Sequence, residues 1–331
     1  MITLPSSEYF NLRPLKMGVY AAIAKEGSPA FSNAGIIDTG DHILIFDTFN
    51  TFRAAEDLRR DAEIISRRLV DYVINSHFHA DHWTGNQVFA DHAKLLATPK
   101  TQDGMLEWAK GFKELQSNPD QCKSYIGETE KNLAMAQDPR LRTHLSWSLA
   151  IEQHKYENLA DTDLHVPNNS FSSTLDIYGK EALVKLYSLG SGHSIDDVIL
   201  ALPEDRIAFI GDLGFFNTHP YLCDSNPEKW IAILDELLNT NINVFVPGHG
   251  PIGSKADLVT LKKYILTLQW MVAKVVEHGG SEEDAVAQPA PEFASNWAGY
   301  GRYEKSIRFL YQRHVNKDNQ TDDNLSRTLK P

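Results

Sequence analysis

Four potential metal ligands stand within six positions of one another in this sequence. His77, His79, Asp81 and His82 directly follow a short apolar run that reads as a strand. Side chains two residues apart in an extended segment point the same way, so the imidazoles of His77 and His79 can reach one ion. A turn after His79 can direct Asp81 and His82 toward a second ion. One short segment therefore predicts ligands for two neighbouring metal sites.

Three more candidate ligands each follow a predicted strand and a glycine. They are His193, Asp212 and His249. Glycine lets the backbone turn tightly, and loops at strand ends are where open α/β sheets place their sites. Singly, each of the three is more typical of a turn, but together with the first motif they indicate one centre. Five imidazoles and two carboxylates without a thiolate favour two zinc ions, and iron or manganese would also suit these ligands.

A centre of this kind predicts hydrolysis. Two metals about 3.5–4 Å apart can share a hydroxide that is nucleophilic at neutral pH, while one of them polarises the oxygen under attack. Asp81 would also act in catalysis, by orienting the hydroxide or passing on a proton. The expected substrate is an ester, thioester, lactone, amide or phosphodiester of a small molecule, and no serine or cysteine nucleophile is required.

The elements that must position these residues are short apolar strands mixed with amphipathic helices. One helix is expected from Phe52, another from near Ser225 with Pro227 in its first turn, and a long one that Gly279 ends. The predicted strands are Val19–Ala24, Ala34–Ile37, Ile43–Phe46, Leu69–Ile74, Leu183–Leu189, Val198–Leu202, Ile207–Ile210 and Val244–Val246. This order indicates a layered α/β domain and permits two sheets packed face to face with helices outside.

Residues 98–161 are polar and helix-prone, which predicts a helical insertion within a single domain spanning residues 1–331. Its two ends connect to elements that reach the metal edge. The insertion is therefore expected to act as a lid over the site or as the contact of a homodimer. Residues 317–331 are expected to form a flexible tail.

Composition limits the partners. The net charge of −12 disfavours nucleic acid, and no apolar stretch is long enough for a membrane span. The N-terminus lacks the features of a signal peptide, which favours a cytoplasmic location. Cys122 and Cys223 cannot form a disulfide framework and are expected to be ordinary thiols. A small-molecule substrate is the expected partner.

The order of the seven ligands resembles the signature of the metallo-β-lactamase superfamily. The resemblance runs from about Val19 to Ile252 and includes Asp47, which matches an early structural aspartate of the family. It implies a four-layer αββα sandwich with the site at one edge. It also implies that His77, His79 and His193 bind one metal, that Asp81, His82 and His249 bind the other, and that Asp212 bridges both.

Within the superfamily, the ligand set is similar to that of glyoxalase II, and the sequence around His193 resembles true β-lactamases. Two positions depart from the latter, because β-lactamases commonly have a cysteine in place of Asp212 and often a lysine in place of Phe215. Acyl-homoserine lactonases place a catalytic tyrosine at the position of Phe215, which cannot donate a hydrogen bond. The residues expected to orient a substrate are His219 and Tyr221.

Two other functions stay open from the sequence. The first is a mononuclear iron oxidoreductase of the persulfide dioxygenase type, which shares the fold. The second is a noncatalytic metal-binding protein, although none of the seven ligand positions has been lost. Metal analysis and a screen of substrates distinguish these functions, because fold alone does not determine the substrate.

Overall fold

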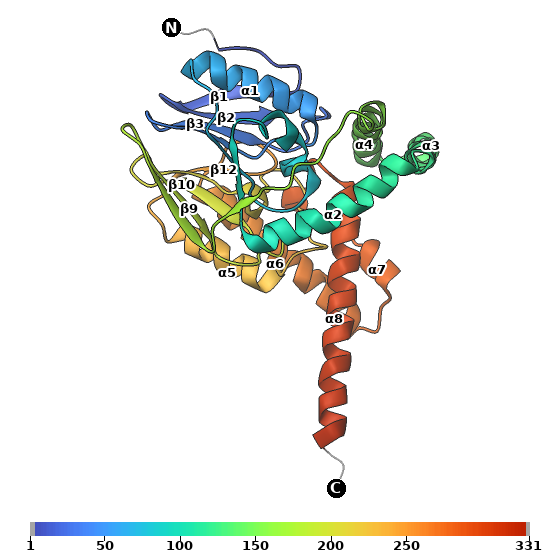
Figure 1. Cartoon of the computed structure of the whole chain (residues 1–331). Coiled ribbons are helices and arrows are strands. Elements are labelled where there is room, and N and C mark those ends of the chain that lie inside the picture. Colours follow the sequence, from blue (N-terminus) through green and yellow to red (C-terminus); the bar gives the residue numbers. More distant parts are fainter. Residues whose placement is uncertain (1–3, 329–331) are drawn as a thin grey trace.

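The computed structural model describes the backbone of residues 4–328 and the side chains of residues 4–316. Two β-sheets stack face to face, and helices cover the outer face of each sheet (Figure 1). This is the four-layer sandwich expected from the sequence. The tail expected over residues 317–331 lies outside the residues whose side chains are described.

The first sheet has seven strands in sequence order. Its first four strands are antiparallel to their neighbours, and β4 to β7 run parallel. The strands are β1 (Phe10–Lys16), β2 (Val19–Ala24), β3 (Ala34–Asp38), β4 (Ile43–Phe46), β5 (Tyr72–Ile74), β6 (Lys94–Ala97) and β7 (Asn169–Ser170).

The second sheet has five strands in the order β12-β11-β10-β9-β8. All its neighbours are antiparallel except the parallel pair β11 and β12. The strands are β8 (Thr174–Tyr178), β9 (Leu183–Ser188), β10 (Val198–Leu202), β11 (Ile207–Phe209) and β12 (Val244–Val246).

Alternating side chains explain why both faces of each sheet are buried. Leu44 and Phe46 of β4 enter the core between the two sheets, whereas Ile45 faces the outer helix. On β10, Leu200 enters the same inter-sheet core and Ile199 packs toward the helices of the second sheet. Side chains of successive strand residues point to opposite faces, so a strand that is apolar throughout must lie between two layers.

Amphipathic helices form the two outer layers. On the first sheet, α1 (Phe52–Ser66) packs its buried apolar face, which includes Leu58, against the strands. The Thr51 side chain caps the N-terminus of this helix. On the second sheet, the outer layer is built from α5 (Pro227–Leu238), α6 (Lys255–Glu277) and the start of α8 (Gly301–Thr328), with the short α7 (Glu282–Val286) beside it.

The segment expected to be a helical insertion forms three helices between β6 and β7. They are α2 (Pro99–Ser117), α3 (Asp120–Met135) and α4 (Pro139–Glu157). In Figure 1, α3 and α4 project to one side of the sandwich. The last of them contacts α8, which joins the insertion to the C-terminal part of the chain.

Some elements differ from the expectation. The helix predicted near Ser225 begins one residue later, because Asn226 accepts the capping hydrogen bond from the Lys229 amide while the Ser225 hydroxyl donates to the Leu222 carbonyl. Leu69 is 60% exposed and precedes β5, so the predicted strand is shorter than expected. β1, β6, β7, β8, α7 and α8 were not predicted from the sequence. β1 contains a proline and lies at a sheet edge, where proline is tolerated and the apolar pattern is weak.

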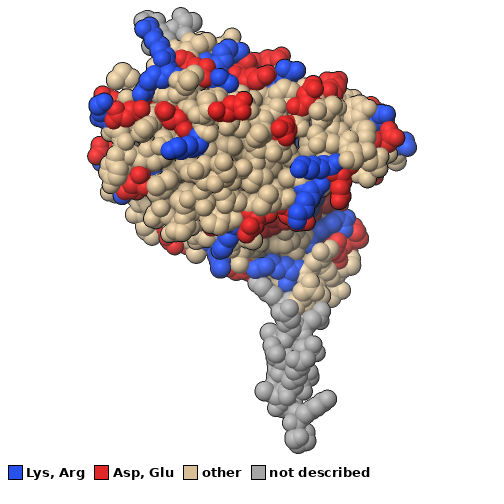
Figure 2. Space-filling view, in the orientation of Figure 1, with Lys and Arg blue, Asp and Glu red and all other residues tan. Residues whose placement is uncertain are grey.

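The surface carries mixed charge. On the face drawn in Figure 2, acidic and basic side chains are interspersed around a broad central area of uncharged residues. Among the described residues, no helix is long and apolar enough to span a membrane. Cys122 and Cys223 are both free thiols. The cytoplasmic location and the homodimer stay predictions.

The core between the sheets is expected to dominate stability. Leu200→Ala removes a fully buried side chain there and should lower the free energy of unfolding by about 2–5 kcal/mol in chemical denaturation. The control Leu69→Ala, at an exposed leucine, should change it by no more than about 0.5 kcal/mol. Equal losses for the two variants would contradict this packing.

Candidate metal centre

The candidate ligands come from loops at one edge of both sheets. His77 follows β5, and His79, Asp81 and His82 continue into a short 3₁₀ turn at Ala80–His82. The other three follow strands of the second sheet, namely β9, β11 and β12, which run in the same direction because β10 is antiparallel to both of its neighbours. Strand ends of the same polarity meet at one edge, so topology brings residues distant in sequence together. The candidates from the second sheet are His193, Asp212 and His249.

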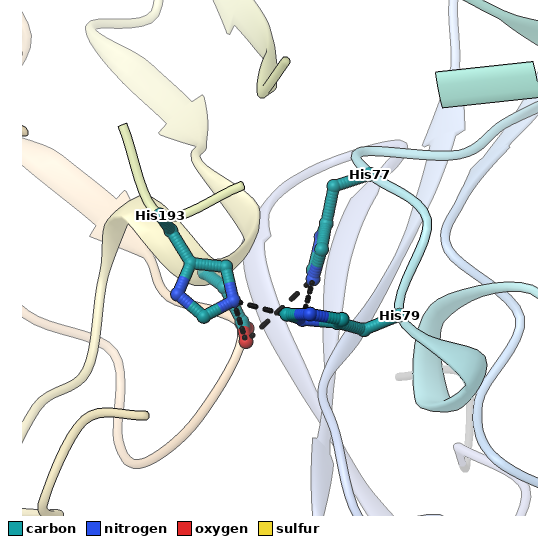
Figure 3. A group of neighbouring side chains, drawn as sticks. His77, His79 and His193 are labelled. Atoms are coloured by element: carbon teal, nitrogen blue, oxygen red, sulfur yellow. Dashed lines mark hydrogen bonds and ion pairs between the residues drawn. The ribbon is translucent and has the colours of Figure 1, made fainter. Parts of the chain in front are cut away.

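Three imidazoles and one carboxylate converge in the first group (Figure 3). The Nδ1 atom of His79 lies 3.0 Å from Nε2 of His77 and 2.9 Å from Nε2 of His193. The Oδ2 atom of Asp212 lies 3.7 Å from His77 Nε2 and 3.2 Å from His193 Nε2. His77, His79, His193 and Asp212 thus turn their potential ligand atoms toward one point.

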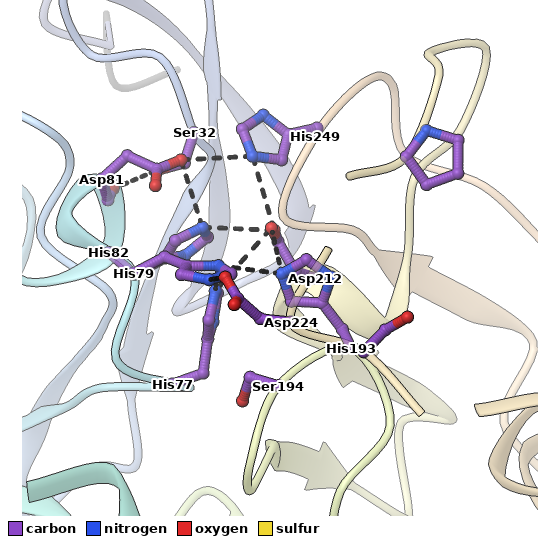
Figure 4. A network of polar contacts seen from close by, with 12 residues as sticks. Ser32, His77, His79, Asp81, His82, His193, Ser194, Asp212, Asp224 and His249 are labelled. Atoms are coloured by element: carbon purple, nitrogen blue, oxygen red, sulfur yellow. Dashed lines mark hydrogen bonds and ion pairs between the residues drawn. The ribbon is translucent and has the colours of Figure 1, made fainter. Parts of the chain in front are cut away.

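The second group lies on the other side of Asp212 (Figure 4). The other carboxylate oxygen of Asp212, Oδ1, is 3.2 Å from His82 Nε2 and 3.5 Å from His249 Nε2. Asp81 Oδ2 is 3.4 Å from His82 Nε2 and 3.2 Å from His249 Nε2. Asp212 therefore presents one oxygen to each group, in the division that the family resemblance implies.

Neighbouring hydrogen bonds set which imidazole nitrogen carries the proton. The single hydroxyl hydrogen of Ser76 goes to Asp47 Oδ2, 2.8 Å away, so Ser76 Oγ must accept from His77 Nδ1 at 2.9 Å. His82 Nδ1 likewise donates to Asp47 Oδ2 at 2.8 Å. In the neutral form, both histidines then carry a free lone pair on Nε2, the atom that points into the cluster.

Hydrogen bonds also set which ring nitrogen carries the proton in His79 and His249. His79 donates from Nε2 to the carboxylate of Asp224, 3.0 Å away, which leaves the lone pair on Nδ1. His249 donates from Nδ1 to the Phe31 carbonyl at 3.1 Å, which leaves the lone pair on Nε2. Histidines that bind metals are held in this way by a hydrogen bond from their second ring nitrogen.

Unsatisfied buried atoms also fit a metal. Asp81 Oδ2, His82 Nε2 and Asp212 Oδ1 are buried and have no hydrogen-bond partner among the described residues. A buried polar atom without a partner is costly, and three of them facing one another are the donor set that a divalent cation satisfies. The residues present therefore fit divalent metal binding.

Burial and charge set the protonation of the cluster. Burial lowers the pKa of His77 well below its usual value, helped by the positive charge of His82, so this imidazole is neutral and able to act as a ligand. Burial raises the pKa of Asp212, but the charges of His249, His82 and His193 outweigh it and bring the net pKa well below the ordinary value. Burial lowers the pKa of His82, but the charges of Asp212, Asp81 and Asp47 outweigh it and hold the net pKa well above the usual value, so a divalent ion bound there would have to displace a proton from this imidazole.

Two backbone features bring the loops this close. Asp47 has a left-handed backbone (φ 61°), which lets its carboxylate accept from the Ser76 amide at 2.7 Å as well as from its two side-chain donors. A Cβ atom at Gly248 would lie 1.9 Å from Asp212 Oδ1. Only glycine fits there, because any side chain would displace the carboxylate that faces both groups.

Comparison with known proteins agrees with this geometry. The sequence model of the metallo-β-lactamase superfamily matches residues 27–249, which include all seven candidate ligands. The chain belongs to the metallo-β-lactamase superfamily. Comparison with curated proteins gives no match.

Solved metallo-β-lactamases share the fold of this superfamily member. The protein from Pontibacter korlensis is 16% identical with a TM-score of 0.55, and the alignment covers 78% of this chain and 99% of that one. The protein from Erythrobacter litoralis is 15% identical with a TM-score of 0.55, covering 80% of this chain and 100% of that one. At these identities the likeness shows the architecture alone.

A cavity of about 430 Å³ adjoins the second group of this metallo-β-lactamase fold. His249 lines it together with residues from the end of β2, from α4 and from the start of α8. The ring of Phe215 stacks on His249 at 4.9 Å between centroids and is buried. The insertion therefore supplies one wall of a cavity that His249, a candidate ligand of the second group, also lines.

The two residues expected to orient a substrate lie in different surroundings. Tyr221 packs edge-on against His79 with centroids 5.8 Å apart, beside the first group. His219 is fully buried, its Nδ1 lies 2.6 Å from the Tyr264 hydroxyl, and aromatic rings surround it. Burial lowers the pKa of His219 to about 4, as expected of a neutral core histidine. Tyr221 thus lies beside the first group, and the described contacts of His219 are with the core.

Sequence reasoning missed Asp224, Phe31 and Arg302. Asp224 and Phe31 anchor ligand histidines, and Arg302 of α8 lines the cavity. A lone aspartate beyond a proline-containing turn and a backbone carbonyl leave no pattern in a single sequence. Arg302 lies far along the chain in a helix that was not predicted.

Asp224 should strengthen metal binding at the first group. Asp224→Ala removes the acceptor that orients His79 and should weaken zinc affinity there by about 10–100-fold, measured by competition with a chelator. Asp224→Asn retains an acceptor oxygen and should lose less. The control Asp41→Ala removes a surface carboxylate paired with Lys180 and should leave affinity unchanged. Wild-type affinity in Asp224→Ala would show that Asp224 does not position His79.

Proposed function

We propose that this protein is a dizinc hydrolase of a small-molecule ester, thioester, lactone, amide or phosphodiester. The observation that carries the proposal is Asp212, whose two oxygens face two separate sets of histidines. His77, His79 and His193 would hold one ion, and Asp81, His82 and His249 the other, with Asp212 shared. Imidazole and carboxylate ligands without a thiolate favour zinc.

Bound divalent ions supply Lewis acidity toward the substrate oxygen and make water nucleophilic at neutral pH. The protein's own residues position the reaction. The buried carboxylate of Asp81, beside His82 and His249, accepts the proton of the attacking water. Tyr221, whose ring packs against His79, would donate a hydrogen bond to the developing oxyanion.

The cavity beside His249 supports a small substrate. Its volume of about 430 Å³ lies within the usual range for small-molecule pockets. Trp147 and Ile151 of α4 form part of its wall, so the insertion contributes to substrate selection as well as to enclosure. This role for the insertion is compatible with a dimer contact on its other faces.

Three ligands in the second group argue against the two alternatives. A mononuclear iron oxidoreductase requires one metal and gives no reason for Asp81, His82 and His249 to converge on a second point, where Asp81 Oδ2 and His82 Nε2 have no hydrogen-bond partner. A noncatalytic metal-binding protein gives no reason for a cavity that opens beside one of the ligands.

Metal content tests the dinuclear centre. The purified protein loaded with zinc should contain about two metals per chain by elemental analysis, because the two ligand groups share only Asp212. His249→Ala should bring this to about one, since it removes a ligand of the second group alone. A fully loaded wild type that stays at one metal per chain would refute the dinuclear proposal.

The role of Asp81 is tested by turnover. Asp81→Asn, assayed with metals replete on a panel of thioesters, lactones, β-lactams and phosphodiesters, should lose at least about a hundredfold in rate while its unfolding transition stays close to wild type. Asp91→Asn is a matched control at an exposed aspartate of the same region. Unchanged turnover in Asp81→Asn would assign the chemistry to other residues.

A further inference from the structure

An arginine without an acidic partner lines the cavity beside the metal centre. Arg302 lies in the first turn of α8, and its guanidinium shares the cavity wall with His249. Its two hydrogen bonds to protein are long, 3.4 Å to the Thr218 hydroxyl and 3.5 Å to the His219 carbonyl. A guanidinium has five N–H donors, so most of them remain available.

Arg302 forms no ion pair with a carboxylate of the described residues. The other arginines of α8 show the contrast, since Arg308 pairs with three glutamates and Arg313 with one. The guanidinium of Arg302 instead lies over the rings of Phe31, at 5.0 Å, and Phe215, at 5.7 Å. An unpaired cation against apolar rings at a cavity wall is poorly solvated by the protein and favours an anionic ligand.

The position of this charge relates it to the metal centre. The Phe215 ring contacts both residues, because the guanidinium of Arg302 lies over it and the imidazole of His249 stacks on it with an interplanar angle of 19°. Burial lowers the pKa of Arg302, and the negative charges of Asp212 and Asp81 act in the opposite direction. The guanidinium is therefore within electrostatic reach of both ligand carboxylates and lines the same cavity as His249.

The remaining charged groups do not replace Arg302 in this role. Lys25 lines the cavity but donates from Nζ to the Ser7 carbonyl at 2.7 Å, and Glu26 is exposed at the rim. His144 lines the cavity beside α8, and burial, followed by the charges of Arg302 and Lys305, lowers its pKa to about 4. It is therefore uncharged at neutral pH.

Five larger apolar side chains line the rest of the cavity, along with polar ones such as Asn33 and Ser148. The apolar ones are Ile23, Phe31, Trp147, Ile151 and Phe216. Trp147 packs closely against Gly27, which fixes the wall contributed by α4. A ligand that fills this space would place an apolar body against these side chains and a single charged group at Arg302.

We propose that Arg302 binds a carboxylate of the substrate, so that the enzyme acts on a compact, mainly apolar ester, lactone or amide that also carries a carboxylate. This inference rests on the proposed hydrolase function and names its substrate class. The planar carboxylate matches the two-pronged guanidinium, and the apolar body fills the wall formed by α4. Arg302 acts in binding and positioning rather than in bond cleavage.

Binding of two matched probes tests the proposal without requiring turnover. The probes are 4-phenylbutyrate and 4-phenylbutanamide, which share their shape and differ in charge, and binding to the zinc-loaded full-length protein is measured by calorimetry. The wild type should bind the carboxylate at least about tenfold more tightly than the amide. Arg302→Met should abolish this preference with little change for the amide, and Arg302→Lys should retain part of it.

Two further variants control for poor folding of Arg302→Met and for the loss of any arginine charge. Thr218→Asp places a carboxylate next to the unaltered Arg302 and should also abolish the preference, even if Arg302→Met folds poorly. Arg13→Met removes an exposed arginine of β1 and should leave the preference intact. A carboxylate preference that persists in both Arg302→Met and Thr218→Asp would show that the anion binds the metals directly and would overturn the proposal.

Kinetics separate this inference from the hydrolase proposal. With p-nitrophenyl butyrate and the mono-p-nitrophenyl ester of glutaric acid, Arg302→Met should raise KM at least about tenfold for the charged ester alone, with kcat nearly unchanged. If neither ester nor any substrate of the panel is hydrolysed while the carboxylate preference depends on Arg302, the hydrolase proposal fails and the anion site stands. A charged ester that is turned over equally well by wild type and Arg302→Met would overturn the anion site.

Discussion

The candidate metal centre depends on the hydrogen bonds that the buried carboxylate of Asp47 accepts. It lies after β4, accepts from the Ser76 amide and hydroxyl after β5, and accepts from His82 in the following turn. One side chain thereby holds two parallel strand ends and a 3₁₀ turn in register. It also directs the lone pairs of His77 and His82 inward. The ring nitrogen that carries the proton in these two candidate ligands is therefore set by a residue that is not itself a ligand.

Local sequence patterns were enough to predict the candidate metal ligands, the central strands and the long helix α6. The motif from His77 to His82 and the glycines before the other three candidates identify the cluster because ligand chemistry restricts residue type and spacing. The central strands β4 and β10 were predicted with the observed bounds, because strands buried on both faces are apolar throughout. Helix α6 was recognised by its regular apolar stripe and its terminal glycines.

The rest of the site depends on contacts that a single sequence does not encode locally. Asp224 reaches His79 across a sequence separation of 145 residues, and Arg302 reaches the cavity from a helix that begins after the family match has ended. The edge strand β1 mixes polar and apolar residues without a clear alternation, so its pairing is decided by its neighbour rather than by its own pattern. His219 shows the converse, because a histidine in a promising turn packs into an aromatic core.

The candidate ligands are divided between the two sheets. Four of them belong to loops of the first sheet and three to loops of the second, and the inter-sheet core is apolar. Ions bound between them would link the two sheets across the open edge of the sandwich, in addition to the apolar core and to hydrogen bonds such as those from Asn33 to the loop after β12. Any sliding of one sheet over the other would then change the coordination geometry of the bound ions. The bound ions would then make the edge of the sandwich that carries the candidate ligands its least deformable part.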